Sequence, residues 1–284
     1  MSFDVSHPEV INIIRFALAE DIGPGDITSN LVIDADQHAT GTFVAREPMV
    51  VAGVELLETI YSARGGVENL TIMHHSGARI EENYHIARVR GRARTLLECE
   101  RVALNFMQRL SGIATMAAEF TDAVQGTRCR VLDTRKTSPG LRRLEKMAAE
   151  AGGAINHRMG LFDAILIKNN HVTAAGGIAP ALDRASKAAL PVEIEVRTRQ
   201  ELEEALAHGA KHLLLDNLMP EEAAEWIRLV DGRATVELSG GITPHSAHAY
   251  AQAGADFISA GAMTHSAPAL DINFRLDWQP NHGA

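Results

Sequence analysis

The chain has 284 residues, 46% of them hydrophobic and 22% charged, a composition typical of a soluble globular protein with room for one large domain or two smaller ones. Its 36 acidic residues outnumber its 27 basic residues and give a net charge of −9, which argues against a diffuse surface for nucleic acid. The apolar runs are only strand-sized, the first residues lack a signal-peptide pattern, and two cysteines are too few for a disulfide scaffold, so we expect a cytoplasmic protein without nucleic-acid or membrane partners.

The first third of the chain has the pattern of a small α+β domain. Ser6-His7-Pro8-Glu9 predicts a capping box that begins at Ser6, and the apolar residues of 10–18 then fall on one face of a helix. Strand-like segments follow at 41–46, 70–74 and 84–90, with a helix at 54–61 between the first two. A helical stretch over 94–126 comes next, and we expect an interruption in it at Ser111-Gly112.

From Cys129 onward, short apolar segments alternate with helical patterns. The expected strands are 130–133, 164–168, 192–196, 212–216, 235–238 and 256–260. Such βα repetition predicts a parallel sheet with crossover helices, and the number of units favours a closed barrel, which could be incomplete, over an open sheet. No Gly-x-Gly-x-x-Gly motif follows the first of these strands to support a dinucleotide-binding sheet. We therefore expect an N-terminal α+β domain at 1–110, joined by a returning segment at 269–284, and a barrel domain at 111–268.

A dense group of cations lies within this acidic chain between residues 133 and 171. Its members are Arg135, Lys136, Arg142, Arg143, Lys146, His157, Arg158 and Lys168. Arg matches carboxylate and phosphate with a planar fork, and Lys supplies a mobile point charge. The group therefore predicts a local site for a small anion that carries both carboxylates and phosphates.

Each cation of this group also has an alternative explanation that involves no ligand. Arg142 and Lys146 fit a solvated face of a helix starting at Pro139, and Arg143 alone of that helix could face the ligand. For Arg135 and Lys136 the alternative is a surface turn, and for His157 an ordinary loop histidine. Their positions after predicted strands favour a ligand site, because the active site of a βα barrel is built at the carboxyl ends of its strands.

Two acids and two Gly-rich segments also lie at expected strand ends. Glu195 and Asp216 end neighbouring strands, and two carboxylates among cations suit either Mg²⁺ or the hydroxyls of a sugar, the alternative being that each pairs with a pocket Arg or Lys. Ser239-Gly240 and Gly261 lie at the last two strand ends, where bare backbone N–H groups could hold a phosphate or where close packing could require glycine. The other histidines, including His74 and His75, lack metal-ligand spacing.

At these motifs the sequence closely resembles the quinolinate phosphoribosyltransferase family, also called carboxylating nicotinate-nucleotide pyrophosphorylases. The matching segments run in order along nearly the whole chain: 20–28, 100–106, 110–115, 133–137, 139–142, 156–158, 167–171, 193–196, 214–217 and 239–242. The resemblance implies an N-terminal α/β sandwich, of the α+β open-sandwich type, and an incomplete α/β barrel. It also implies a homodimer, or a higher oligomer of such dimers, in which each barrel faces the partner's N-terminal domain.

The resemblance also implies a role for each matching residue. Arg135, His157, Arg158 and Lys168 would bind the quinolinate carboxylates, with Arg101 donated by the other subunit, and Lys136 and Lys168 would also bind phosphoribosyl pyrophosphate. Glu195 and Asp216 would contact the ribose hydroxyls and Mg²⁺, and the loops at Ser239, Gly240 and Gly261 would hold the 5′-phosphate. The catalytic residues would be Lys136, Lys168, Glu195 and Asp216. The chain departs from the family at Asn169, commonly Asp, and at Ala154, commonly Gly, and neither change removes an expected ligand contact.

The expected reaction is phosphoribosyl transfer to quinolinate with decarboxylation, giving nicotinate mononucleotide, pyrophosphate and CO₂ in de novo NAD biosynthesis. Three alternatives remain at this point. A nicotinate phosphoribosyltransferase would act without decarboxylation and would need fewer cations. A phosphate-handling barrel isomerase or lyase would leave Arg101, Arg135 and Arg158 unexplained. A non-catalytic anion-binding paralogue would gain nothing from Glu195 and Asp216.

Overall fold

The computed structural model describes residues 4–278, which divide into two compact units. The first unit comprises Met1–Ala117, Ser138–Gly153 and Ser266–Ala284, and the second comprises Ala118–Thr137 and Ala154–His265. Compared with the expected boundaries of 1–110 and 111–268, residues 138–153 group with the first unit, because α5 (Arg142–Ala151) packs against α1 (Pro8–Ile22). The end of the expected returning segment, 279–284, lies outside the described residues.

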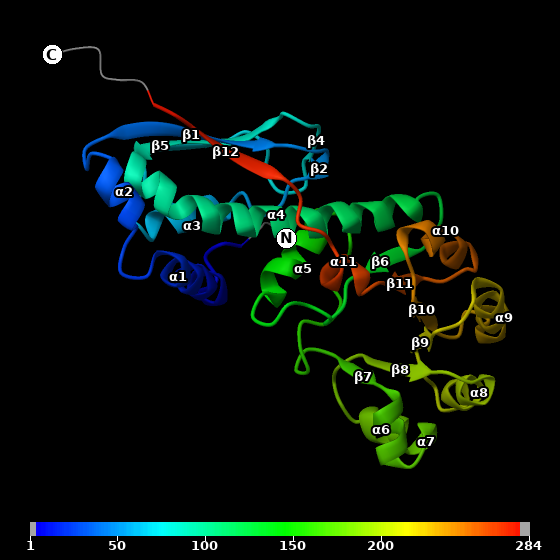
Figure 1. Ribbon diagram of the computed structural model, residues 1–284. Coiled ribbons are helices and arrows are strands. Elements are labelled where there is room, and N and C mark those ends of the chain that lie inside the picture. Colours follow the sequence, from blue (N-terminus) through cyan, green and yellow to red (C-terminus); the bar gives the residue numbers. More distant parts are fainter. Residues whose placement is uncertain (1–3, 279–284) are drawn as a thin grey trace. The chain divides into compact units, whose positions relative to one another are not determined.

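The first unit is built on a four-stranded antiparallel sheet with the order β12-β1-β5-β3. Its strands are β1 (His38–Ala45), β3 (Asn69–Ile72), β5 (His85–Arg92) and β12 (Ile272–Asp277). A short pair, β2 (Met49–Val50) and β4 (Arg79–Ile80), extends the unit. The last strand pairs with β1, and the rings of Phe43 and Phe274 lie 4.8 Å apart across that pair. The sheet lies over α4 (Ala93–Ala123) and α3 (Leu56–Ser62) (Figure 1).

Helix α1 is present where the apolar spacing predicted it, but its cap is not the expected one. The N-cap is His7, whose Nδ1 accepts the backbone N–H of Glu9 at 3.2 Å. Ser6 instead bonds to Asp4, so the predicted capping box at Ser6 is wrong. Pro8 occupies the first helical position, where its missing N–H costs nothing. The short helix α2 (Ile27–Val32) follows and is capped by Asp26.

Helix α4 runs without interruption for 31 residues, so the break expected at Ser111-Gly112 is wrong. Both residues serve close packing inside the first unit rather than a turn. The hydroxyl of Ser111 accepts the backbone N–H of Ala52 at 3.0 Å. A Cβ at Gly112 would lie 1.8 Å from the carbonyl oxygen of Pro268, so only glycine allows the returning segment to approach the helix.

The second unit is an incomplete barrel of six parallel strands in the order β6-β11-β10-β9-β8-β7. The strands are β6 (Arg130–Leu132), β7 (Ile165–Ile167), β8 (Val192–Val196), β9 (His212–Asp216), β10 (Thr235–Ser239) and β11 (Phe257–Ser259). The end strands β6 and β7 are not neighbours in this order, and Ile155 adds one parallel bridge beside Leu132 of β6. The incomplete barrel predicted from the sequence is therefore confirmed.

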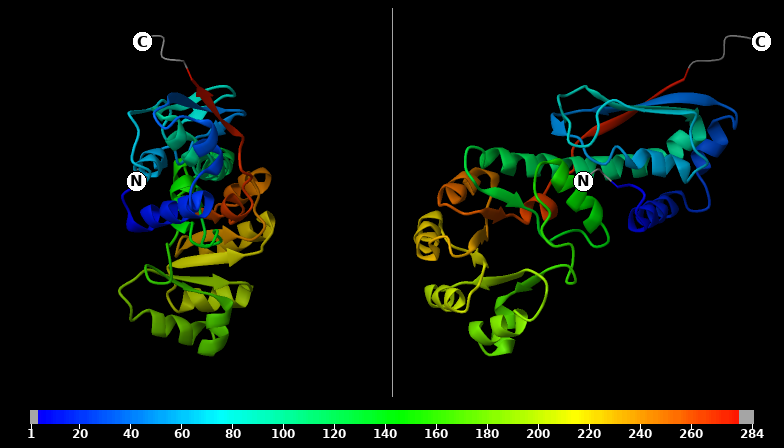
Figure 2. Two further views of the ribbon diagram at one scale, coloured as in Figure 1. Left: turned by 60° about the vertical axis from the view of Figure 1, so that its left-hand side comes forward. Right: turned by 180° about the vertical axis from the view of Figure 1, so that it is seen from behind.

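Helices follow strands β7 to β11 of the second unit. They are α6 (Asn169–Ala175), α7 (Ile178–Ala185), α8 (Arg199–Ala207), α9 (Pro220–Val230), α10 (Pro244–Gln252) and α11 (Ala262–His265). Helices α8, α9 and α10 lie side by side along the outside of the strands (Figures 1 and 2). Leu213, Leu214 and Leu215 of β9 are all buried, as expected for a parallel strand covered on both faces.

Within residues 4–278, no helix has the length and apolar character needed to cross a membrane.

Candidate functional site

A cavity of about 590 Å³ opens at the carboxyl ends of the barrel strands in the second unit and is called the barrel cavity below. Residues at or just after the ends of β6, β7, β10 and β11 line it, together with Leu214 of β9. The predicted acids Glu195 and Asp216, on β8 and β9, are not among the lining residues. The predicted site residues that line it are Arg135, Lys136, His157, Arg158, Lys168, Ser239, Gly240 and Gly261. The cations Arg135 and Lys136 follow β6, Arg158 follows the Ile155 bridge, and Lys168 follows β7. Four cations from three strand ends thus meet at one cavity.

The guanidinium groups of Arg135 and Arg158, both of which line the cavity, are partly buried and close to each other. Arg135 Nε is buried and has no hydrogen-bond partner among the described residues. Burial lowers the pKa of Arg158 below its usual value, and the neighbouring charge of Arg135 lowers it further. Arg158 Nη1 donates to the carbonyl of Ala164 at 3.3 Å. Such a pair is electrostatically unfavourable alone and would be stabilised by an anionic ligand.

The two predicted acids each bond a residue of the cavity wall. Lys168 Nζ lies 3.3 Å from Glu195 Oε2, and the Glu195 carboxylate is buried. Asp216 Oδ1 accepts the Ser239 hydroxyl at 2.6 Å, and its Oδ2 accepts the Asn217 amide at 2.7 Å. The strands that bear these acids, β8 and β9, are neighbours in the sheet. Their carboxylate oxygens are the ligand type that Mg²⁺ prefers, so the donor set fits that ion.

Close packing explains two of the predicted glycines directly. A Cβ at Gly261 would lie 2.6 Å from Lys136 Cδ, so the side chain of Lys136 passes over the end of β11. The hydroxyl of Thr264 donates a hydrogen bond to the backbone carbonyl of Lys136 at 2.8 Å. Gly240 has φ +101°, and a Cβ there would lie 2.3 Å from Asn217 Oδ1. Both glycines line the cavity, Gly240 half-buried and Gly261 buried.

A cluster that the sequence reasoning missed lies deeper in the barrel. His157 Nε2 is 3.1 Å from Glu193 Oε2 and 3.6 Å from Glu237 Oε2. Burial, together with the adjacent carboxylate of Glu193, raises the pKa of Glu237 to about 8. Ligand atoms of these three residues lie within 4.8 Å of one another, and the predicted metal pair Glu195 and Asp216 is not part of the group. The sequence offers one indication of this cluster: Glu193 and Glu237 are acidic residues inside strands that are otherwise mostly apolar.

The remaining predicted cations lie elsewhere. Lys146 is fully buried in α5, so the prediction that it faces solvent is wrong. Arg143 Nε instead binds Glu9 Oε2 at 2.7 Å, within the first unit, rather than facing a ligand. Arg142 begins α5 and is half-buried. Arg101 is exposed on α4 and is not among the residues that line the barrel cavity.

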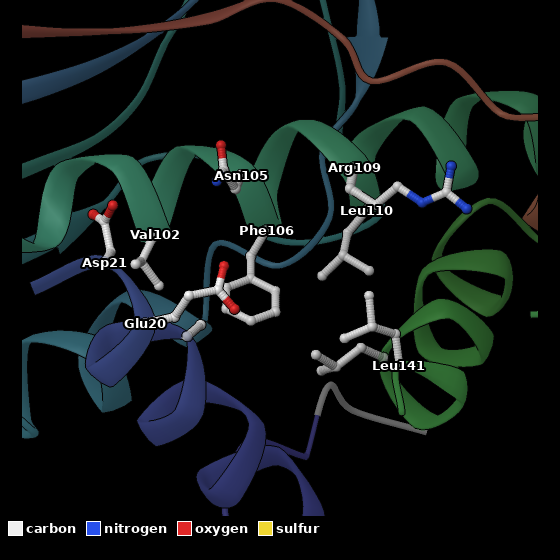
Figure 3. A pocket seen from close by; sticks show the side chains of 10 residues that line it. Glu20, Asp21, Val102, Asn105, Phe106, Arg109, Leu110 and Leu141 are labelled. Atoms are coloured by element: carbon white, nitrogen blue, oxygen red, sulfur yellow. The ribbon is translucent and has the colours of Figure 1, made fainter. Parts of the chain in front are cut away.

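A second, smaller hollow of about 170 Å³ lies in the first unit between α1, α4 and α5 (Figure 3). Phe106, Leu110 and Leu141 form its apolar wall, and the carboxylates of Glu20 and Asp21 lie at its side. Its lining cation, Arg109, binds Glu145 at 3.0 Å and points away from the hollow. This hollow is therefore unsuited to a polyanion, whereas the barrel cavity is suited to one.

Comparison with known protein families gives two matches that together span most of the chain. The model described as "Quinolinate phosphoribosyl transferase, C-terminal domain" matches residues 113–275. The model described as "Quinolinate phosphoribosyl transferase, N-terminal domain" matches residues 26–111.

Individual relatives agree over nearly their whole lengths. The chain is 41% identical to the nicotinate-nucleotide pyrophosphorylase [carboxylating] of Mycobacterium leprae, covering 93% of this chain and 95% of that protein. It is 37% identical to a quinolinate phosphoribosyltransferase [decarboxylating] of Nicotiana tabacum, covering 96% and 84%. The solved structure of the nicotinate-nucleotide pyrophosphorylase from Francisella tularensis superposes with a TM-score of 0.89 at 35% identity, covering 98% of this chain and 99% of that one.

Proposed function

Because the chain belongs to the quinolinate phosphoribosyltransferase family, we propose that its barrel cavity carries out the family's reaction. The enzyme transfers the phosphoribosyl group of phosphoribosyl pyrophosphate to quinolinate with decarboxylation, giving nicotinate mononucleotide for NAD biosynthesis. The observation that carries this proposal is the meeting of four cations around one cavity in a chain of net charge −9. Two substrates with carboxylates and phosphates account for that concentration of charge.

The carboxylates of quinolinate are assigned to the paired guanidinium groups. The buried Nε of Arg135 has no acceptor among the described residues. The charge of Arg135 also lies close enough to Arg158 to lower the pKa of Arg158. A dicarboxylate between them would satisfy the donor and cancel the repulsion, and each Arg can bind a carboxylate through two parallel hydrogen bonds. A monocarboxylate would cancel only part of the repulsion between the two guanidinium groups, so the pair favours quinolinate over nicotinate.

The phosphoribosyl substrate is assigned to the lysines and the Gly-rich segments of the cavity. Lys136 and Lys168 supply mobile charges for the pyrophosphate, and the backbone at Ser239, Gly240 and Gly261, which line the cavity, would receive the 5′-phosphate. These glycines come from the last two strands, where barrels commonly bind phosphate. Glu195 and Asp216 would accept hydrogen bonds from ribose hydroxyls.

Group transfer at this site forms one bond and breaks one at the ribose C1. The pyridine nitrogen donates its electron pair to C1 while the bond from C1 to the pyrophosphate oxygen breaks, and the leaving group takes that pair. Lys136 and Lys168 stabilise the negative charge on the departing pyrophosphate, and the carboxylate of Asp216 or Glu195 stabilises the positive charge that develops on the ribose.

Decarboxylation then breaks the bond between C2 and its carboxylate. The electron pair remains on C2, where the adjacent cationic ring nitrogen stabilises it, CO₂ leaves, and a proton restores the aromatic C–H. Arg135 and Arg158 hold the ring in place during this step. Glu195 and Asp216 would hold Mg²⁺, which would neutralise pyrophosphate charge when bound.

Arg101 is proposed to complete the site from a partner subunit in a homodimer. The support is its exposure on α4 in the first unit and the family resemblance at residues 100–106.

A cytoplasmic location is proposed on a separate ground. Cys99 and Cys129 are buried free thiols, as expected in a reducing compartment.

One assay tests the proposed function. Purified enzyme is incubated with Mg²⁺, phosphoribosyl pyrophosphate, and quinolinate carrying a ¹⁴C label in its 2-carboxylate. We expect nicotinate mononucleotide and labelled CO₂ in equal amounts. The alternative, a nicotinate phosphoribosyltransferase without decarboxylation, would form nucleotide from nicotinate and leave the quinolinate label unreleased.

A further inference from the structure

Glu145, in the first turn of α5, is a fully buried acid that accepts hydrogen bonds on both of its carboxylate oxygens. Arg109 of α4 donates to its Oε1 from Nε at 3.2 Å and from Nη2 at 3.0 Å. The backbone N–H of Ser138 donates to its Oε2 at 3.0 Å. Arg109 also donates from Nη1 to the backbone carbonyl of Ala267 at 2.8 Å. The Arg109–Glu145 pair therefore binds the chain at two points far apart in the sequence.

Both points lie where the chain passes between the two compact units. The second unit ends at Thr137 and again at His265, and the first unit resumes at the next residue in each case. The pair binds Ser138 and Ala267, each of which is two residues along the chain from a residue that lines the barrel cavity, Lys136 or His265. The first unit is thus bonded to chain segments that lead directly into the cavity of the second.

A tight turn presents the N–H of Ser138 to Glu145. The N–H of Leu141 donates to the carbonyl of Ser138 at 3.1 Å. Pro139 and Gly140 are the two central residues, and Gly140 has φ +80°, which is typical of a type II turn. The carbonyl of Leu141 in turn accepts the N–H of Glu145 at 2.9 Å as α5 begins. The position of Ser138 is therefore set by the turn, the helix start and the buried carboxylate together.

Lys136 has a second backbone anchor, supplied by α11. The hydroxyl of Thr264, which is fully buried, donates to the carbonyl of Lys136 at 2.8 Å. Thr264 is three residues before Ala267, which Arg109 holds. The backbone of Lys136 is thus held directly by Thr264 and, through Ser138, by Glu145. Fixing the backbone of a long side chain reduces the freedom that it loses when it binds a ligand.

Arg135 is held differently, although it directly precedes Lys136. Its segment leaves β6 at the fully buried Asp133, whose N–H donates to the carbonyl of Ile155 at 3.0 Å within the second unit. A change at Glu145 should therefore disturb Lys136 more than Arg135. This difference separates an effect on one ligand from a general loss of structure.

We propose that Glu145, bound to Arg109, is a positioning residue that places Lys136 for the pyrophosphate of the phosphoribosyl substrate. Glu145 is not among the residues that line the barrel cavity, so it acts through the backbone of residues 136–138. The proposal rests on the proposed function for its ligand. It adds a buried acid of the first unit to the residues on which phosphoribosyl transfer depends.

Binding of inorganic pyrophosphate with Mg²⁺, measured by titration calorimetry, tests the proposal without turnover. Gln at position 145 keeps the shape of Glu but offers one acceptor and one donor, so it cannot accept from both Arg109 and Ser138. We expect Glu145→Gln to raise Kd for pyrophosphate about tenfold. In a Lys136→Ala background the same substitution should change Kd by less than about twofold, because no side chain is left to position.

The outcomes of this titration are distinct. Wild-type affinity in Glu145→Gln, or an equal rise of Kd in both backgrounds, would overturn the positioning role while leaving the proposed function intact. A wild-type enzyme that binds no pyrophosphate would instead overturn the proposed function, and the positioning role with it.

Kinetics supply a readout that a purely structural role would not give. We expect Glu145→Gln to raise KM for phosphoribosyl pyrophosphate about tenfold and to leave KM for quinolinate within about threefold. Thr264→Val removes the other anchor of Lys136 at nearly constant shape and should give the same split, so it tests the proposal even if Glu145→Gln does not fold. Equal rises in both KM values would overturn it.

The matched control is Glu98→Gln, also in the first unit. Arg64 donates to Glu98 Oε2 from Nε at 3.2 Å and from Nη2 at 2.8 Å, which repeats the contact between Arg109 and Glu145. In the described part of the chain neither residue of this control pair bonds Ser138 or Ala267. Glu98→Gln should therefore leave both KM values and the Kd for pyrophosphate unchanged, and a split like that of Glu145→Gln would contradict the proposal.

Discussion

Replacing Arg135 with alanine should separate binding of quinolinate from stability of the fold. Arg135 Nε is buried without an acceptor, so its natural partner is the ligand carboxylate. Removing one partner of a buried charged pair costs about 2–5 kcal/mol, and about 1.4 kcal/mol corresponds to a factor of ten. We therefore expect Arg135→Ala to reduce kcat/KM for quinolinate by roughly two to three decades.

The same substitution should not weaken the unliganded protein. In the absence of ligand, Arg135 lowers the pKa of Arg158 by charge repulsion, and its own buried donor is unsatisfied. Both effects disappear in Arg135→Ala, so its unfolding temperature should equal or exceed that of the wild type, while the thermal shift on adding quinolinate should be lost.

The assay is steady-state kinetics with quinolinate varied at saturating phosphoribosyl pyrophosphate, beside a thermal unfolding series. Arg88→Ala, on an exposed position of β5 in the first unit, changes the net charge equally and should leave kcat/KM unaltered. A loss of less than threefold in Arg135→Ala, or an equal loss in the control, would refute the reasoning.

Three further predictions follow from the packing, the buried acid and the proposed dimer. Gly261→Ala should raise KM for phosphoribosyl pyrophosphate more than KM for quinolinate, because the new Cβ would displace Lys136, and equal effects would contradict this. The pKa of Glu237 is about 8 in the folded protein, against an ordinary value of 4.5. Between these two pH values the folded protein keeps the Glu237 proton and the unfolded chain releases it. The free energy of unfolding that this proton contributes is therefore lost as the pH rises from about 4.5 to about 8. Glu237→Gln should therefore gain unfolding temperature relative to wild type between pH 5 and pH 8, and a constant difference would be the contrary result. Coexpressing Arg101→Ala with Arg135→Ala chains should restore about a quarter of the sites if Arg101 acts across a dimer, whereas a site built within one chain would stay inactive.

The positions of the strands could be predicted because buried parallel strands leave short apolar runs, and the carboxyl ends of such strands meet in space. The same reasoning predicts that Arg135, Lys136, Arg158 and Lys168 share one ligand site, and all four line the barrel cavity.

Other features could not be predicted because they depend on contacts between segments far apart in the chain. Ser111 and Gly112 have the composition of a turn, yet each meets a distant backbone segment and the helix continues. Lys146 looks like a surface residue of a helix, but its helix is packed into the first unit. The partners of His157 lie on β8 and β10, so nothing in its own neighbourhood indicates that its ring is already engaged.

The most direct test of the account is the fate of the quinolinate 2-carboxylate during a single turnover. Enzyme in excess over 2-carboxylate-labelled quinolinate, with phosphoribosyl pyrophosphate and Mg²⁺, is quenched and analysed for CO₂ and nucleotide. The account predicts one labelled CO₂ for each nicotinate mononucleotide formed, and no nucleotide from nicotinate at the same concentration. Nucleotide that retains the label, or equal use of nicotinate, would contradict the assignment of the cationic cavity to a decarboxylating transfer.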